Sequence, residues 1–96
     1  GGQEMEMEQL YRDHSDRVYG YIYLLVRHKE SAEDLTQETF YKAFKGYASF
    51  DKQASPATWI LKIARNVTYD YFRRKRVVQF FSFEKNHDIE TKGLSP

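Results

Sequence analysis

Residues 56–76 read PATWILKIARNVTYDYFRRKR, and this stretch decides the fold. Ser55 followed by Pro56 is a strong start signal for a helix, because the hydroxyl can cap free amides and proline suits the first helical position. At about 100° per residue, the apolar side chains of the stretch fall within one arc. These side chains are Ile60, Ile63, Ala64, Val67 and Tyr71. The stretch therefore predicts a helix that buries one face in a core.

The opposite face of this predicted helix carries cations, an amide and an aromatic ring at spacings of one, three or four residues. We call it the basic stripe, and its members are Lys62, Arg65, Asn66, Tyr69, Arg73 and Arg76. Cations can follow phosphates, an amide can read a base edge, and a phenol ring can stack on a base with about 1 to 3 kcal/mol. The stripe therefore suits single-stranded nucleic acid. A merely solvated helix face is the alternative.

Two further features of the same stretch have local explanations. The run Arg73-Arg74-Lys75-Arg76 would also complement the dipole at the C-terminus of a helix. Asp70 lies three residues before Arg73 and four after Asn66. This spacing predicts that Asp70 is a local ion-pair or orienting partner.

Few helix breakers interrupt the chain before residue 76, since proline occurs only at positions 56 and 96. Helical spacing of apolar residues, with Val18, Ile22 and Leu25 on one side of the second segment, predicts three further helices. A capping-box-like Ser31-Ala32-Glu33-Asp34 marks the start of the third. The predicted helices span about 4–13, 15–28, 31–46 and 56–76.

We therefore expect an all-α fold, a compact bundle of about four helices with a flexible C-terminal linker. The bundle domain would span residues 4–76, and residues 77–96 would begin an interdomain linker, although Phe80, Phe81 and Phe83 could still pack on the domain. The Gly-Gly start predicts that residues 1–3 are a disordered cloning remnant.

The predicted helix over 31–46 divides into two faces with chemistry opposite to the basic stripe. Its expected inward residues, with one just beyond its end, are Leu35, Thr39, Phe40, Ala43, Phe44 and Tyr47. Its expected outward residues are Asp34, Gln37, Glu38, Tyr41 and Lys45. An acidic stripe with an embedded tyrosine suits a protein partner. A solvated face is again the alternative.

Charge is distributed unevenly along the chain, although the formal net charge is only +1. Residues 4–40 carry nine acidic and four basic residues, residues 41–76 carry two and nine, and residues 77–96 carry three and two. A chain that is acidic in front and basic behind suggests two different partners, one of them a polyanion.

Several functional classes lack support in the sequence. There is no cysteine, and His14, His28 and His87 lie in three different segments without metal-ligand spacing. Neither a glycine-rich phosphate loop nor a nucleophile elbow is present. We therefore expect no catalytic residue, metal, cofactor or enzymatic activity. No apolar run approaches the roughly 18 residues of a membrane span, so membrane insertion is not expected.

Two strings together resemble region 2, the core domain of the extracytoplasmic-function (group IV) sigma factors of the sigma-70 family. The first is AEDLTQETF at residues 32–40, and the second is TWILKIARN at residues 58–66, continued by Asp70 and Arg73. The resemblance covers about residues 8–76 and includes the spacing through Tyr47-Ala48-Ser49-Phe50. It implies an all-helical bundle in a non-catalytic bacterial transcription initiation factor.

The resemblance also implies partners and contact residues. The outward face of the 31–46 helix would dock on the clamp helices of the polymerase β′ subunit through Asp34, Gln37, Glu38 and Tyr41. The loop over 50–58 and the Asn66 face would hold the non-template strand of the promoter minus-ten element with a base flipped out. The implied DNA-binding residues are Phe50, Lys52, Lys62, Arg65, Asn66, Tyr69, Arg73, Arg74 and Arg76. Core RNA polymerase, promoter DNA and an inhibitory anti-sigma factor are the implied partners, in the bacterial cytoplasm.

The sequence departs from the family pattern at two places. The connection over 27–30 lacks the glycine often found there, and the loop over 51–55 has its own composition, so base preference is not transferred. Trp59 lies beside the core arc, and packing is favoured over base stacking for it. The family's helix-turn-helix domain has no counterpart, so we expect a fragment. A helical protein-interaction module without specific DNA binding is the competing hypothesis.

Overall fold

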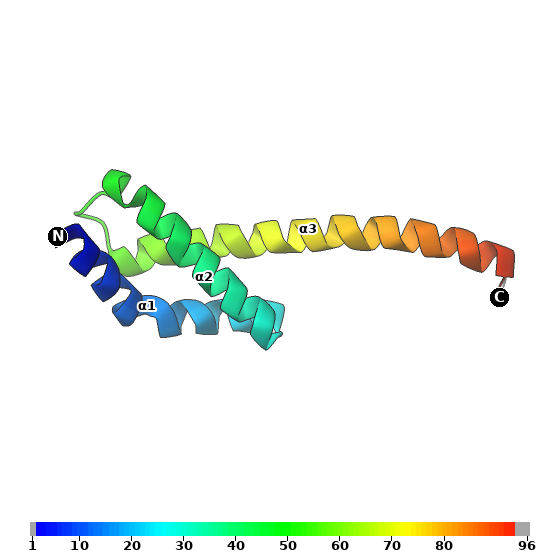
Figure 1. Cartoon of the computed structure of the whole chain (residues 1–96), viewed down its shortest axis with the longest axis horizontal. Helices are drawn as coiled ribbons and strands as arrows, with labels where there is room; N and C mark the ends of the chain where they lie inside the picture. The colour runs from blue at the N-terminus through cyan, green and yellow to red at the C-terminus, as the bar shows by residue number, and fades with distance from the viewer. Residues whose placement is uncertain (1, 94–96) are drawn as a thin grey trace.

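The computed structural model of the chain describes the backbone of residues 2–93 and the side chains of residues 5–82. Within these residues the fold is all-α. It consists of α1 (Gly2–Val26), α2 (Lys29–Gly46), a 3-10 turn η1 (Tyr47–Ser49) and α3 (Pro56–Gly93). The three α-helices contact one another pairwise. Figure 1 shows that they meet around the first half of α3, while the second half of α3 extends away from the other two.

The described residues hold three α-helices where the sequence predicted about four. The segments expected as separate helices over 4–13 and 15–28 form the single helix α1. Neither proline nor glycine stands near His14, so nothing in the sequence interrupts the hydrogen bonds of the backbone there. The same helix includes Gly2 and Gln3, where an unstructured start was expected.

The reversal between α1 and α2 depends on Arg27, which has a φ of 56°. Its amide still donates to the carbonyl of Tyr23 at 2.8 Å, and its guanidinium lies 6.0 Å from the centre of the Tyr23 ring. A left-handed backbone costs a residue with a Cβ about 1 to 2 kcal/mol, which explains why glycine is common at such a position. Arg27 therefore ends α1 in a strained conformation.

The start of α2 lies two residues earlier than the predicted capping box. His28 is the N-cap residue, and its Nδ1 accepts a hydrogen bond from the Ser31 amide at 3.2 Å. The Ser31 hydroxyl is 3.0 Å from the same nitrogen and accepts a hydrogen bond from the Tyr71 hydroxyl at 3.3 Å. The prediction that Ser31 caps the helix was wrong because an imidazole can serve as the acceptor.

The core lies where α1, α2 and α3 meet, and its buried hydrophobic residues include most of those that the helical spacing predicted. They are Leu10, Val18, Ile22, Ala32, Leu35, Phe40, Ala43, Ile60, Ala64 and Val67. Ile63, Tyr47 and Tyr71 are half-buried. Leu25 and Phe44 were also expected inward, but they lie in the last turns of their helices and remain 40% and 39% exposed.

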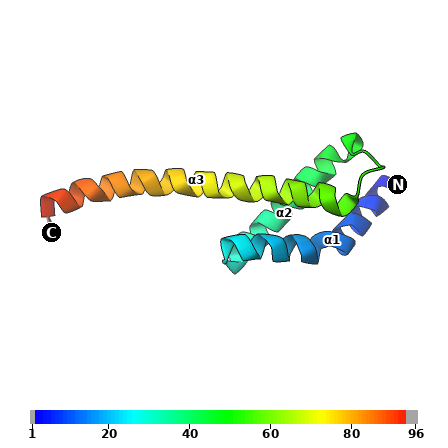
Figure 2. The same cartoon turned by 180° about the vertical axis from the view of Figure 1, so that it is seen from behind.

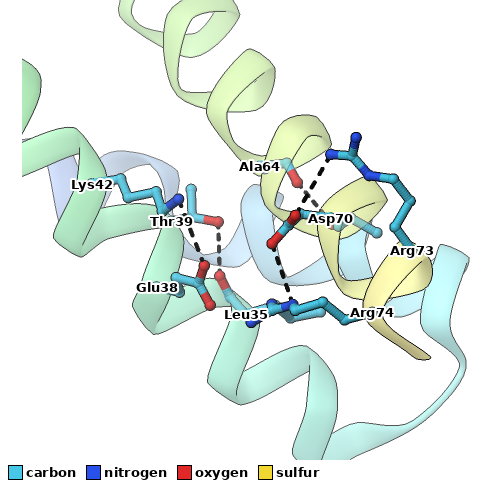
Figure 3. Close-up of polar contacts among 9 residues, drawn as sticks. Leu35, Glu38, Thr39, Lys42, Ala64, Asp70, Arg73 and Arg74 are labelled. Carbon is cyan, nitrogen blue, oxygen red and sulfur yellow. Dashed lines mark hydrogen bonds and ion pairs between the residues drawn. The ribbon is translucent and has the colours of Figure 1, made fainter. Parts of the chain in front are cut away.

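Three threonines are buried in this core, namely Thr36, Thr39 and Thr68. Each hydroxyl donates to the carbonyl four residues earlier, at Ala32, Leu35 or Ala64, over 2.7 Å. Figure 3 shows the bond between Thr39 and Leu35 beside the crossing of α2 and α3. Because every hydroxyl has a partner, these hydrogen bonds offset the cost of removing the hydroxyls from water.

Helix α3 starts at Pro56 as predicted, with the Ser55 hydroxyl accepting from the Thr58 amide at 3.3 Å. Its predicted end at Arg76 was wrong, and the expected flexible linker is helical as far as Gly93. Residues 77–92 contain neither proline nor glycine, so local sequence does not stop the helix. Phe80 and Phe81 are exposed, not packed on the bundle, and Phe83 and residues 94–96 lie outside what the structure describes at side-chain level. Figure 2 shows this extension from behind.

Candidate nucleic-acid and protein interfaces on α2 and α3

The basic stripe lies on one exposed face of α3. All six of its predicted members are exposed. Asn66, Tyr69, Arg73 and Arg76 line a shallow hollow of about 590 Å³, together with Phe72. Phe72 was missed in the sequence, although it lies three residues after Tyr69 and at the edge of the stripe. The hollow therefore combines an amide, two cations and two aromatic rings.

Arg65 and Tyr69 form a pair within the stripe. The guanidinium carbon of Arg65 lies 5.0 Å from the centre of the Tyr69 ring, a distance typical of a cation–π contact. Hydrogen bonding to Tyr69 raises the pKa of Arg65 above its ordinary value. Arg65 thus stays cationic beside an aromatic ring that is itself 47% exposed. A base could stack on the ring face that Arg65 leaves open.

Asp70 holds two of the cations of α3. Its carboxylate lies 3.5 Å from Nη2 of Arg73 and 3.2 Å from Nε of Arg74. Dashed lines mark both ion pairs in Figure 3. This confirms the prediction of a local ion-pair partner. Exposed pairs of this kind contribute about 0.2 to 1 kcal/mol, so a phosphate could displace the carboxylate at small cost. Arg76 has no ion pair among the described side chains.

The predicted DNA-binding residue Phe50 lies away from this hollow, against Trp59 at the start of α3. The two rings are stacked, with centroids 4.5 Å apart and an interplanar angle of 29°. Trp59 is half-buried and packs against the hydrophobic core, and the Tyr47 ring lies 6.2 Å from it. The structure confirms the packing prediction for Trp59. One face of the Phe50 ring is covered.

Lys52, the other predicted DNA contact in the loop, is engaged with the start of α1. Its Nζ lies 3.4 Å from Oε2 of Glu6 and 3.9 Å from the centre of the Tyr47 ring. The Tyr47 hydroxyl donates to the same Glu6 oxygen at 2.8 Å. These contacts, with Tyr47 contributing most, lower the pKa of Glu6 and raise the pKa of Lys52. Sequence reasoning missed this cluster, because 41 residues separate Glu6 from Tyr47.

The predicted protein-binding residues gather on the outward face of α2. Asp34, Gln37 and Tyr41 are exposed, and Glu38 is half-buried. The Glu38 carboxylate lies 3.8 Å from the Lys42 ammonium, an ion pair marked by a dashed line in Figure 3. The Lys45 ammonium lies 5.2 Å from the centre of the Tyr41 ring. The structure thus brings the four predicted residues together on one surface, with lysines at its border.

A groove of about 510 Å³ lies between α2 and α3. Its acidic wall carries Asp34 and Glu38, its basic wall carries Arg74 and Lys75, and its remaining lining consists of Ser31, Leu35, Tyr71 and Val78. An acidic wall and a basic wall therefore face each other across this groove, and none of the six residues of the basic stripe lines it. Periodicity could not reveal it, because the crossing of two helices is a tertiary feature.

The part of the chain with described side chains shows no cluster of three or more residues suited to hold a metal ion. Among those same side chains, no buried nitrogen or oxygen lacks a hydrogen-bond partner. None of the described helices is sufficiently long and apolar to span a membrane.

The family model for sigma-70 region 2 matches residues 10–77, which include the outward face of α2, the loop before α3 and the whole basic stripe. The chain belongs to the sigma-70 region 2 family. This confirms the resemblance carried by the two strings over 32–40 and 58–66. The matched region ends at Val77, whereas α3 continues to Gly93.

Curated relatives of this region 2 chain come from several bacteria. It is 36% identical over 83 residues to RNA polymerase sigma factor YlaC of Bacillus subtilis, covering 86% of the chain and 48% of that protein. It is 32% identical over 98 residues to ECF RNA polymerase sigma factor SigX of the same species, covering 97% and 50%. Identity to ECF RNA polymerase sigma factor BldN of Streptomyces coelicolor is 44% over 69 residues, covering 71% and 26%. The chain thus spans half or less of the length of these relatives.

Proposed function

We propose that this chain acts in a bacterial transcription initiation factor, where it joins core RNA polymerase to promoter DNA without itself catalysing a reaction. Membership of the sigma-70 region 2 family supports the proposal, as do relatives that are named RNA polymerase sigma factors. The domain responsible spans residues 4–76, and residues 77–96 lead toward a further domain. Its place of action is the bacterial cytoplasm.

The polymerase contact in this proposal is the outward face of α2. Asp34, Gln37, Glu38 and Tyr41 lie together there, and three of them are exposed. Carboxylates on a surface favour a partner with cations and disfavour a polyanion, so this face suits a protein better than DNA. The partner is the pair of clamp helices of the β′ subunit. An inhibitory anti-sigma factor is a further partner in this proposal.

The DNA contact is the basic stripe with its hollow, and this is the observation that carries the proposal. Asn66 lies between cations that can follow phosphates and beside Tyr69, whose ring can receive a base. A hollow lined by an amide and aromatic rings can bind an extruded base of the minus-ten non-template strand. Binding only the extruded base offsets the few kcal/mol that flipping costs, so melting is coupled to recognition. Phe50 and Lys52 would support the strand near the start of α3.

Binding to core RNA polymerase tests the proposal most directly. The chain is added to core polymerase and, separately, to its isolated β′ clamp helices, and the complex is then given a non-template minus-ten oligonucleotide. We expect the chain to bind both proteins, and we expect the complex to bind the minus-ten strand with higher affinity than a scrambled strand. A folded chain that binds neither protein would favour the competing hypothesis, a helical interaction module with another partner.

A further inference from the structure

Two phenylalanines on the extension of α3 lie outside the function described so far. Phe80 is 56% exposed and Phe81 is 66% exposed. Their ring centroids are 5.9 Å apart with an interplanar angle of 77°. Because neighbours in a helix differ by about 100° in direction, the two rings belong to different faces of α3.

Phe80 continues the basic stripe. It follows Arg76 by four residues, as Arg73 follows Tyr69, so it keeps the spacing of three or four that defines the stripe. Phe81 instead follows Val78 by three residues and Tyr71 by ten. Tyr71 and Val78 form a second line of side chains on α3, and this line faces the groove between α2 and α3. The two rings are therefore similarly exposed but lie on different faces of α3.

We propose that Phe80 is a second base-stacking platform for single-stranded nucleic acid, at the far end of the basic stripe. This inference rests on the proposed function and extends it beyond the residues that match the family model. Arg73 and Arg76 lie between Tyr69 and Phe80, so cations for phosphates separate the two exposed aromatic rings. Alternation of cations with aromatic rings is the pattern with which proteins bind a single strand.

The rise of α3 sets the length of strand that can reach both rings. Tyr69 and Phe80 are 11 residues apart, which places their positions about 16 Å apart along the axis at about 1.5 Å per residue. A strand that keeps about 3.4 Å between successive nucleotides covers this distance in about five steps, and therefore with about six nucleotides. At this spacing a strand of four nucleotides reaches one ring, whereas a strand of twelve reaches both.

A nucleic acid fits Phe80 better than an apolar protein surface does. On the stripe its preceding neighbours are the cations Arg73 and Arg76, which complement a polyanion. Of the other exposed apolar residues of the extension, Val78 and Phe81 lie on the other line, and Val77, three residues before Phe80 and four before Phe81, lies between the two lines.

The test compares Phe80→Ala with Phe81→Ala in the 96-residue chain. Both variants remove the same exposed ring, and alanine favours the helix, so circular dichroism should show unchanged helix content. Binding to oligothymidylates of four and twelve nucleotides is measured at low salt, alone and with core polymerase. We expect Phe80→Ala to weaken binding of the 12-mer about 5- to 150-fold and of the 4-mer about twofold or less. Phe81→Ala should leave the affinity for both oligonucleotides unchanged. Phe80→Trp, which keeps an aromatic ring at this position, should bind with the affinity of the unaltered chain.

The outcomes separate this inference from the proposed function. If Arg76→Ala weakens binding of the 12-mer but Phe80→Ala does not, the basic stripe stands and the second platform is wrong. If Phe81→Ala weakens binding as much as Phe80→Ala, the ring acts through general apolar contact and the inference is overturned. If the unaltered chain binds neither oligonucleotide, with or without polymerase, both the inference and the proposed DNA contact fail.

Discussion

Tyr71 on α3 donates a hydrogen bond to Ser31 on α2 over 3.3 Å, and Ser31 in turn lies 3.0 Å from the imidazole of His28. The contact joins the middle of the longest helix to the reversal between α1 and α2. The same Tyr71 ring lines the groove between the acidic wall on α2 and the basic wall on α3. The hydroxyl of Tyr71 thus joins the two helices that carry the proposed interfaces.

Replacing Tyr71 with phenylalanine removes this hydrogen bond and keeps the ring. We expect the free energy of unfolding to fall by about 0.5 to 1 kcal/mol, because the contact is long and only partly buried. Urea denaturation of Tyr71→Phe, Ser31→Ala and the double variant would measure the coupling of the two residues. Strictly additive losses would show that the hydroxyls contribute independently.

Reversing the charge of Asp34 and Glu38 to lysine should weaken binding to core polymerase. The two carboxylates lie on the proposed docking face, and like charges across an interface cost several kcal/mol. Circular dichroism should show an intact helical fold, because Asp34 is exposed and Glu38 is half-buried. The paired control is Glu8→Lys with Asp13→Lys on α1, which makes the same change of charge elsewhere. Unchanged affinity in the Asp34/Glu38 variant would refute the docking assignment.

Replacing Arg76 with alanine should weaken binding of every single strand to a similar extent. It removes one phosphate contact, so the slope of log affinity against log salt should flatten by about 0.7 while discrimination between sequences persists. Arg73→Ala should have a smaller effect, because Asp70 already pairs with that cation. Arg12→Ala removes a charge from α1 and serves as control. A loss confined to one sequence would argue for base reading by Arg76.

Replacing Asn66 with alanine should affect discrimination instead. The charge is unchanged, but the candidate partner of a base edge is lost, so the preference for the correct strand over a scrambled one should shrink by about 1 to 3 kcal/mol. The measurement uses polymerase-bound chain and non-template oligonucleotides at several salt concentrations, and the salt slope should stay constant. An equal loss for all sequences would remove Asn66 from the base-reading role.

Replacing Arg27 with glycine should stabilise the fold by about 0.5 to 1 kcal/mol. Glycine adopts the positive φ of 56° without the strain of a Cβ, although its greater freedom in the unfolded chain offsets part of the gain. Thermal unfolding would measure the change. The control is Arg17→Gly in the interior of α1, which should destabilise the fold. A destabilised Arg27→Gly would indicate that the contact with the Tyr23 ring outweighs the strain.

Local patterns predicted the parts of this fold that depend on local physics. The spacing of Ile60, Ala64 and Val67 identified the buried face of α3, and the Ser55-Pro56 pair identified its first residue. The basic stripe was visible for the same reason, because a helix turns a sequence spacing into a surface. Asp70 was assigned correctly as an ion-pair partner because its partners lie within one turn.

The parts that the sequence could not reveal depend on distant residues or on alternatives of similar energy. Lys52 was expected to be available to DNA, yet Glu6 and Tyr47 from other elements engage it. The N-cap at His28 was missed because serine is the commoner acceptor. The groove between α2 and α3 depends on how two helices cross, which periodicity does not encode.

The uninterrupted course of α3 from Pro56 to Gly93 has a geometric consequence for anything that follows the bundle. A helix keeps phase, so the direction of each side chain on the extension is set by the number of residues that separate it from Asn66. Inserting one residue after Arg76 would turn everything beyond it by about 100° and move it about 1.5 Å along the axis. Inserting seven would nearly restore the direction. Insertions of whole helical turns can therefore lengthen α3 while the side chains of the extension stay in line with the basic stripe. Single-residue insertions would turn those side chains away from the stripe.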